Sequence, residues 1–199
     1  MAHGIDVASD VTDSLDCIVA KGITFVMRYY SQNSDKALSA KEVEAIKLAG
    51  LYIGTVYEDG PTQTSYFTSI RGTQDAKRAE EQAQNVGQPD GTTIYFAVDF
   101  DVVPMNLWAI INYFQAVKEQ LAISGKYNAG CYGSGFVCQH LLQVGLATRT
   151  WLALSKGWLG YAAFKSSGDW NILQLDEIPQ NYCDLDVDTD LTQGNGGGW

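Results

Sequence analysis

The sequence predicts an α/β fold in which strands and helices alternate and close into a (β/α) barrel. Eight short apolar runs recur along the 199 residues with almost no polar alternation, which is typical of strands buried on both faces. Helical stretches separate the first of these runs, and a strand–helix–strand alternation favours right-handed crossovers within one sheet.

The apolar runs are rich in β-branched and aromatic residues and give the expected strands in chain order. They are Gly4–Val7, Ile23–Tyr30, Leu51–Tyr57, Thr93–Phe100, Tyr127–Tyr132, Thr150–Ser155, Trp170–Leu175 and Cys183–Val187. Such residues fit extended backbone that packs on both sides.

Helix signals stand between the runs. Ser39 and Glu42 form a capping box, Thr73 is the expected cap of the next helix, and Pro104 opens a long helix that closes at Gly125. After about residue 147 only short connections remain. Since a typical barrel of this type has about 250 residues, the sequence predicts a modified TIM-type barrel, with about five β/α units followed by a strand-rich C-terminal part.

We expect one domain over residues 1–193 and a flexible Gly-rich tail over 194–199. The 46% of hydrophobic residues can fill a core, which excludes a disordered chain. No window approaches the roughly 18 to 20 apolar residues of a membrane span. We expect a monomer.

The charge is acidic and uneven. The chain carries 23 Asp and Glu against 13 Lys and Arg, a net charge of −10, and its last 34 residues contain seven carboxylates and no Lys or Arg. Nucleic-acid binding depends on clustered basic residues, so nucleic acid is excluded as a partner.

The four cysteines leave two interpretations open. Cys17, Cys131, Cys138 and Cys183 form no Cys-x-x-Cys pair, so they are either two disulfides of a secreted protein or four buried thiols. With two histidines in the chain a zinc site is not expected, and we expect no metal and no cofactor. No signal peptide is visible, so the chain is either intracellular or a mature secreted form.

In a barrel, chemistry belongs at the carboxyl-terminal ends of the strands. Polar and aromatic residues gather where the runs end, and they include carboxylates from four runs. The candidates are Asp6, Arg28, Tyr29, Tyr57, Glu58, Asp99, Asp101, Tyr132, Gln174, Asp184 and Asp186. Asp99 and Asp101 are two residues apart and share one face of a strand. Close carboxylates separate their pKa values, as glycoside hydrolysis requires of its acid and its base or stabiliser.

Three of these carboxylates also have a purely structural interpretation. Asp101 can cap the helix that follows, Asp6 can form a buried ion pair with Arg28, and Glu58 can belong to a polar turn. The alternating acids of 184–190 lack the Gly and Glu that an EF-hand needs, and no nucleophile elbow or phosphate loop is present.

The residues resemble those of a known family. Gly4–Val7, the Ala97–Asp101 segment, Tyr132-Gly133 and the late Leu173-Gln174 with Asp184–Asp186 resemble glycoside hydrolase family 25, the lysozyme-type muramidases. The likeness is closer to a sister group, the glycoside-hydrolase-like TIM-barrel domains of unknown function. It spans residues 3 to 191, and the YFAVDFD stretch is its most specific part.

The resemblance implies a (β/α) barrel that cleaves the β-1,4 link after N-acetylmuramic acid in peptidoglycan. It implies active-site carboxylates at Asp6, Asp99, Asp101 and Asp184. The muramidase motif is Asp-x-Glu, whereas Asp101 here holds the third position, so Glu58 is a substitute proton donor.

We therefore expect an extracellular or cell-wall-directed muramidase. Asp101 or Glu58 is the acid, Asp99 orients substrate or stabilises positive charge, and Asp6 completes the acidic site. Substrate contacts are expected from Asp184, Arg28, Tyr29, Tyr57, Tyr132, Trp151 and Gln174. A non-catalytic glycan-binding barrel and a metal-dependent hydrolase that uses the same carboxylates are the alternatives.

Overall fold

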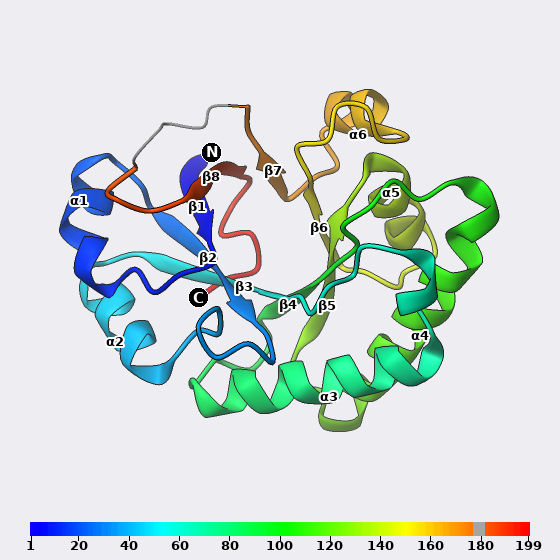
Figure 1. The fold of residues 1–199 in the computed structure, drawn as a ribbon, viewed down its shortest axis with the longest axis horizontal. Coiled ribbons are helices and arrows are strands. Elements are labelled where there is room, and N and C mark those ends of the chain that lie inside the picture. Colours follow the sequence, from blue (N-terminus) through cyan, green and yellow to red (C-terminus); the bar gives the residue numbers. More distant parts are fainter. Residues whose placement is uncertain (177–181) are drawn as a thin grey trace.

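The computed structural model describes residues 1–176 and 182–199, and within them eight strands form a closed barrel surrounded by helices (Figure 1). The strands are β1 (Ala2–Val7), β2 (Phe25–Tyr30), β3 (Tyr52–Tyr57), β4 (Thr93–Ala97), β5 (Asn128–Gly133), β6 (Arg149–Leu152), β7 (Ile172–Gln174) and β8 (Val187–Thr192). Neighbours in the barrel are neighbours in the chain. The predicted modified (β/α) barrel is confirmed.

Strands β1 to β7 pair in parallel, and β8 runs antiparallel to both β7 and β1. The prediction of the eighth strand over 183–187 was wrong, because β8 begins only at Val187. Cys183 and Asp184 have the left-handed φ angles of 56° and 62°, and Cys183 is disulfide-bonded to Cys17. The chain therefore turns where an extended run was expected.

Helices follow the first six strands. They are α1 (Leu15–Ala20), α2 (Ala40–Leu48), α3 (Ser69–Asn85), α4 (Leu107–Ser124), α5 (Gly135–Gln143) and the short α6 (Tyr161–Ser167). The Ser39 side chain caps α2 as predicted, by accepting from the Glu42 N–H at 3.1 Å. Thr68, not Thr73, caps α3. Thr73 lies one turn inside the helix, where its hydroxyl donates to the Ser69 carbonyl.

Two apolar layers hold the barrel together. The larger lies between strands and helices, and the smaller fills the interior with alternate side chains that include Phe25, Met27, Tyr95 and Trp151. A glycine faces the large interior side chains where space is short. A Cβ on Gly130 would lie 2.7 Å from the Tyr95 ring, so only glycine fits beside that tyrosine.

The last six residues lie at the amino-terminal ends of β3 and β4, where they form backbone hydrogen bonds with both strands. Trp199 and Ile53 exchange both backbone hydrogen bonds, at 2.7 and 3.0 Å, and Gly197 O accepts from Thr93 N at 2.9 Å. The buried Tyr95 hydroxyl donates to Gly196 O at 2.7 Å. In place of the expected flexible tail, residues 194–199 form a cap that satisfies backbone groups of two strands.

The cysteines match neither interpretation in full. Cys17 and Cys183 form a disulfide with a Cα–Cα distance of 5.8 Å, which joins α1 to the segment before β8. Cys131 and Cys138 are free and buried. Within the described residues, no helix has the length and apolar character needed to cross a membrane.

Candidate functional site

Carboxylates from four strand ends meet at the carboxyl end of the barrel, the end where β1 to β7 finish. Asp6 lies on β1, and Glu58 and Asp99 follow β3 and β4. Asp188 pairs with Asp6 in the register of β8 with β1, and Asp190 lies one interior position deeper. These five carboxylates define the acidic cluster discussed below.

Gln174 ties the cluster together. Its Nε2 donates to Asp6 Oδ2 at 3.0 Å and to Asp188 Oδ2 at 3.1 Å. Its Oε1 accepts from the Leu154 N–H at 2.9 Å and from the Tyr132 hydroxyl at 3.3 Å. The amide of Gln174 therefore has one fixed orientation, in which it bridges two carboxylates.

Asp6 is buried, with 5% of its surface exposed. Desolvation and, after it, the charge of Asp188 raise the pKa of Asp6 to about 6, although hydrogen bonds from Gln174 and Tyr29 oppose the rise. The Tyr29 hydroxyl donates to Asp6 Oδ1 at 3.0 Å. Asp6 is consequently half protonated near pH 6, where an ordinary aspartate is ionised.

Asp190 lies below Asp6 and is completely buried. The indole Nε1 of Trp151 donates to Asp190 Oδ1 at 2.9 Å. Desolvation and the neighbouring Asp6 raise the pKa of Asp190 well above its usual range.

A second pair of carboxylates, Glu58 and Asp99, lies across the cluster. Lys36 Nζ is 2.7 Å from Glu58 Oε1 and also lies 4.0 Å above the ring of Tyr29. Partial burial and the charge of Glu58 raise the pKa of Asp99, and Lys36 lowers it. Asp99 is therefore the half-buried acid of a carboxylate pair whose other member is ion-paired.

Tyr132 lies near both carboxylate pairs, Asp6 with Asp190 and Glu58 with Asp99. Desolvation and nearby carboxylates raise the pKa of its hydroxyl well above the usual range, and those carboxylates are Asp6, Asp99, Glu58 and Asp190. Tyr132 and Tyr29 are both partly exposed.

Asp59 holds the loops that carry Lys36 and Glu58. Its carboxylate accepts from Ser31 Oγ at 2.7 Å, Gln32 N at 2.9 Å and the Tyr57 hydroxyl at 2.6 Å. Burial opposes ionisation, but these hydrogen bonds lower the pKa of Asp59. The loop after β2 is thereby fixed against the loop after β3.

The structure removes Arg28 from the expected substrate contacts. Arg28 is completely buried on the outer face of β2, where Nε and Nη2 bind Glu42 at 2.6 and 3.1 Å and Nη1 donates to Val7 O at 2.7 Å. Its ion-pair partner is Glu42 on α2 and not Asp6. Arg28 joins the sheet to the helical layer.

Tyr57 and Trp151 also lack the exposed ring faces expected of sugar contacts. Tyr57 points outward into the layer between strands and helices, and 1% of its surface is exposed. Trp151 points inward, is equally buried, and acts on the cluster only through Asp190. Both predictions as sugar-stacking residues were wrong because side chains at strand ends alternate between two buried faces.

Asp101 and Asp184 lie apart from the acidic cluster. β4 ends at Ala97, so strand alternation does not extend to Asp101, whose exposed carboxylate accepts from the Leu159 N–H at 2.9 Å. Asp184 is exposed in the turn before β8. Asp188 and Asp190 reach the cluster instead; extending the last strand through the alternating acids of 184–190 could have identified them.

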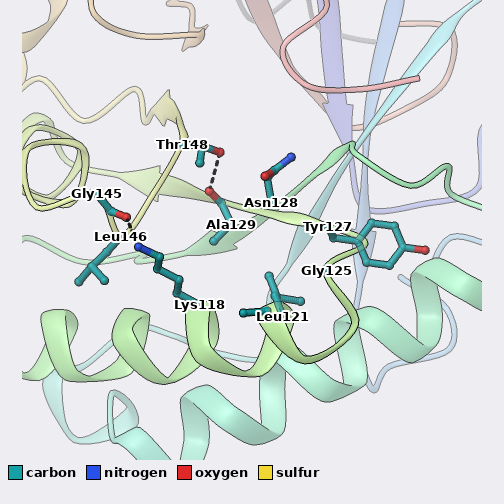
Figure 2. A pocket seen from close by; sticks show the side chains of 10 residues that line it. Lys118, Leu121, Gly125, Tyr127, Asn128, Ala129, Gly145, Leu146 and Thr148 are labelled. Carbon is teal, nitrogen blue, oxygen red and sulfur yellow. Dashed lines mark hydrogen bonds between the residues drawn. The ribbon is translucent and has the colours of Figure 1, made fainter.

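One cavity lies far from this cluster, near the amino ends of β5 and β6 (Figure 2). It has a volume of about 240 Å³, and its polar groups already have partners within the protein. Lys118 Nζ donates to Gly145 O at 3.0 Å and Thr148 Oγ1 to Ala129 O at 3.1 Å. The described residues hold no group of three His, Cys, Asp or Glu side chains placed to bind a metal.

The model of the Rv2525c-like, glycoside hydrolase-like domain family matches residues 16–193. The chain belongs to this family. It is 34% identical over 167 residues to the uncharacterized protein YbfG of Bacillus subtilis, an alignment that covers 79% of this chain and 23% of YbfG. The sister group expected from the sequence motifs is thereby confirmed.

The barrel fold of this chain is also found in solved structures. The Tat-secreted protein Rv2525c of Mycobacterium tuberculosis, in complex with HEPES, matches with a TM-score of 0.80 at 19% identity, covering 100% of this chain and 98% of that one. A muramidase from Trichobolus zukalii matches with a TM-score of 0.63 at 15% identity, covering 98% and 94%. The chain spans about a quarter to a third of the length of the curated relatives it matches.

Proposed function

We propose that this glycoside-hydrolase-like barrel is a muramidase that hydrolyses the glycan of bacterial peptidoglycan. The observation that carries the proposal is the meeting of two carboxylate pairs at the carboxyl end of the barrel, each with a raised pKa in at least one member. Glycoside hydrolysis needs a protonated carboxyl for the leaving oxygen and a charged carboxylate for the developing oxocarbenium ion.

In this proposal Asp99 is the proton donor. Its raised pKa keeps a larger protonated fraction than an exposed aspartate has, and the adjacent Glu58 carries the negative charge. Lys36 holds Glu58 in place at 2.7 Å. Tyr29 and Tyr132 provide partly exposed rings against which a sugar can stack.

The substrate class rests on the neighbours. A muramidase from Trichobolus zukalii shares the fold, and the relative from Mycobacterium tuberculosis is a secreted protein. We therefore propose an extracellular or wall-directed monomer that acts on peptidoglycan.

The test is digestion of purified peptidoglycan followed by mass analysis of the released muropeptides. The wild-type protein should release fragments that end in reducing muramic acid. Asp99→Asn and Glu58→Gln should each lower the rate by about 100-fold or more, the usual contribution of a general acid. Glu44→Gln, an exposed carboxylate on α2, is the matched control and should leave the rate unchanged.

Asp101→Asn tests Asp99 against Asp101, the position at which the family motif has its proton donor. Asparagine keeps an oxygen that accepts from the Leu159 N–H, so the loop contact survives while the acid is lost. Retained activity supports Asp99 as the donor, and lost activity assigns the donor to Asp101. Saccharide binding without any product indicates a glycan-binding barrel, and loss of activity in EDTA indicates a metal-dependent hydrolase.

A further inference from the structure

Asp190 has no part in the proposed chemistry, yet it is a completely buried carboxylate inside the barrel. Its Oδ1 accepts from the Trp151 indole at 2.9 Å. Its Oδ2 is also buried and receives no hydrogen bond from any N–H or O–H of the described residues. The register of β8 with β1 places Asp190 diagonally beside Asp6, one interior position below Asp188, and a hydrogen bond between the two carboxyl groups contributes to the pKa shifts of both.

Two ionised carboxylates cannot form a hydrogen bond, since both are acceptors only. Burial of a second unpaired negative charge at this depth would cost several kcal/mol. A single proton between Asp6 and Asp190 removes one charge and supplies the missing donor. The contact therefore requires one carboxyl and one carboxylate.

Within the part of the chain that the structure describes, no ion pair compensates the buried charge. Among the ion pairs of the described residues, none involves Asp6, Asp188 or Asp190. Asp188 adds negative charge from β8, and Glu58 and Asp99 add it from the ends of β3 and β4. The cation of the site, Lys36, is bound to Glu58. Tyr29, Gln174 and Trp151 contribute neutral donors alone.

We propose that Asp190 is a positioning residue that shares one proton with Asp6 and thereby fixes the side chains that line the site. Asp6 orients Tyr29 and Gln174 through its two oxygens, and Gln174 in turn holds Tyr132. Loss of the shared proton places two negative charges in contact and disturbs this arrangement. The role of Tyr29 and Tyr132 as sugar contacts rests on the proposed function, whereas the shared proton does not.

The test is a carboxyl-carbon NMR titration of protein labelled with ¹³C in its aspartate side chains. In the wild-type protein Asp6 and Asp190 should show linked titration steps well above the usual aspartate range. In Asp190→Asn, where asparagine still accepts from Trp151 and its amide can donate to Asp6, the upper titration step should disappear and Asp6 should titrate in a single step, because no second ionisable carboxyl remains. Asp90→Asn, exposed near the opposite end, is the control and should leave the Asp6 midpoint unchanged.

Independent titration of both groups near ordinary aspartate values in the wild-type protein would overturn the shared proton, and this reading needs no variant to fold. An Asp6 titration in Asp190→Asn with the same steps as in the wild-type protein would overturn it as well. The titration needs no catalytic activity, so its failure is distinct from failure of the proposed function.

The positioning role has its own readout. On peptidoglycan, Asp190→Asn should move the alkaline limb of the kcat/KM profile to higher pH while folding is retained, because asparagine has no proton to lose. An unchanged profile together with loss of the upper titration step would contradict the positioning role and leave the glycosidase proposal standing.

Discussion

The two ends of the barrel use the same interior face in opposite ways. At the carboxyl end, interior positions carry Asp6, Asp188 and Gln174, and the pKa of a buried carboxyl is raised. At the amino end, large apolar side chains fill the interior and residues 194–199 close it with backbone hydrogen bonds. The carboxyl end of the barrel keeps carboxylates that can bind a ligand or a proton. At the amino end, the polar groups are paired within the protein.

The reversed direction of β8 accounts for both ends. Because β8 is antiparallel to its neighbours, it starts at the carboxyl end, where Asp188 and Asp190 face the interior. It finishes at the amino end, from which the last residues reach Ile53 and Thr93. One strand thus supplies acid to the site and brings the cap to the opposite end.

The largest expected effect on stability tests the outer face of the carboxyl end. Arg28→Ala should lower the free energy of unfolding by about 3 to 5 kcal/mol, because it leaves the buried Glu42 without its ion-pair partner. Urea denaturation measures this loss. Activity per folded molecule should stay at the wild-type level. A loss of activity in the folded fraction would show that Arg28 contributes to the site.

The pH dependence of stability tests the interior of the carboxyl end. The pKa of Asp6 is raised in the folded state, so its stabilisation is complete below the usual value near 3.8 and is lost as pH rises to about 6. The loss amounts to about 3 kcal/mol. The pKa of Asp190 is raised as well, and Asp190→Asn removes that pH-dependent loss. Urea denaturation at several pH values should therefore show Asp190→Asn gaining stability relative to wild type between pH 4 and 7. A relative stability that is independent of pH would contradict the burial of a shared proton.

The closed end should respond in stability alone. Gly197 has a φ of 82°, and a Cβ there would lie 2.6 Å from Thr93 Oγ1. Gly197→Ala should cost about 2 kcal/mol in the free energy of unfolding, through backbone strain and crowding. Gly91→Ala is the matched control, since it has a similar φ of 85° and open space around its Cβ. Equal losses in the two variants would mean that the cap contributes nothing beyond its backbone angle.

The smallest effect concerns Lys36. Its charge lowers the pKa of Asp99, so Lys36→Met should move the midpoint that Asp99 contributes to the pH–rate profile upward by less than about one unit. A downward shift would show that Lys36 acts on Asp99 in another way. Lys47→Met, an exposed lysine on α2, is the control.

The sequence could predict the barrel and the gathering of carboxylates at its carboxyl end, but not which side chains point into the barrel. Arg28 and Tyr29 are consecutive at the end of β2, yet one binds Glu42 outside the barrel and the other binds Asp6 inside. A strand buried on both faces has no polar alternation from which the inward face can be read. The same ambiguity accounts for the errors at Tyr57 and Trp151.

The roles of other residues depend on contacts between segments that are far apart in the sequence. The sequence predicts no role for Asp188 and Asp190, because the expected last strand begins at Cys183, in the disulfide-bonded turn, whereas β8 begins at Val187. Lys36 lies in a loop with no motif to mark it and reaches Glu58 only through the folded geometry. Glycine residues near the end of the chain suggested flexibility, whereas close contact with Ile53 and Thr93 is what requires them.

Hydrolysis of peptidoglycan in H₂¹⁸O tests the central claim most directly, because it reports which bond takes up water at the acidic cluster. The account predicts that fragments released by the wild-type protein carry one ¹⁸O atom at the reducing carbon of muramic acid, and that Asp99→Asn releases none. Label in the peptide stem, or unlabelled glycan with no fragments at all, would contradict a glycosidase at the carboxyl end of this barrel.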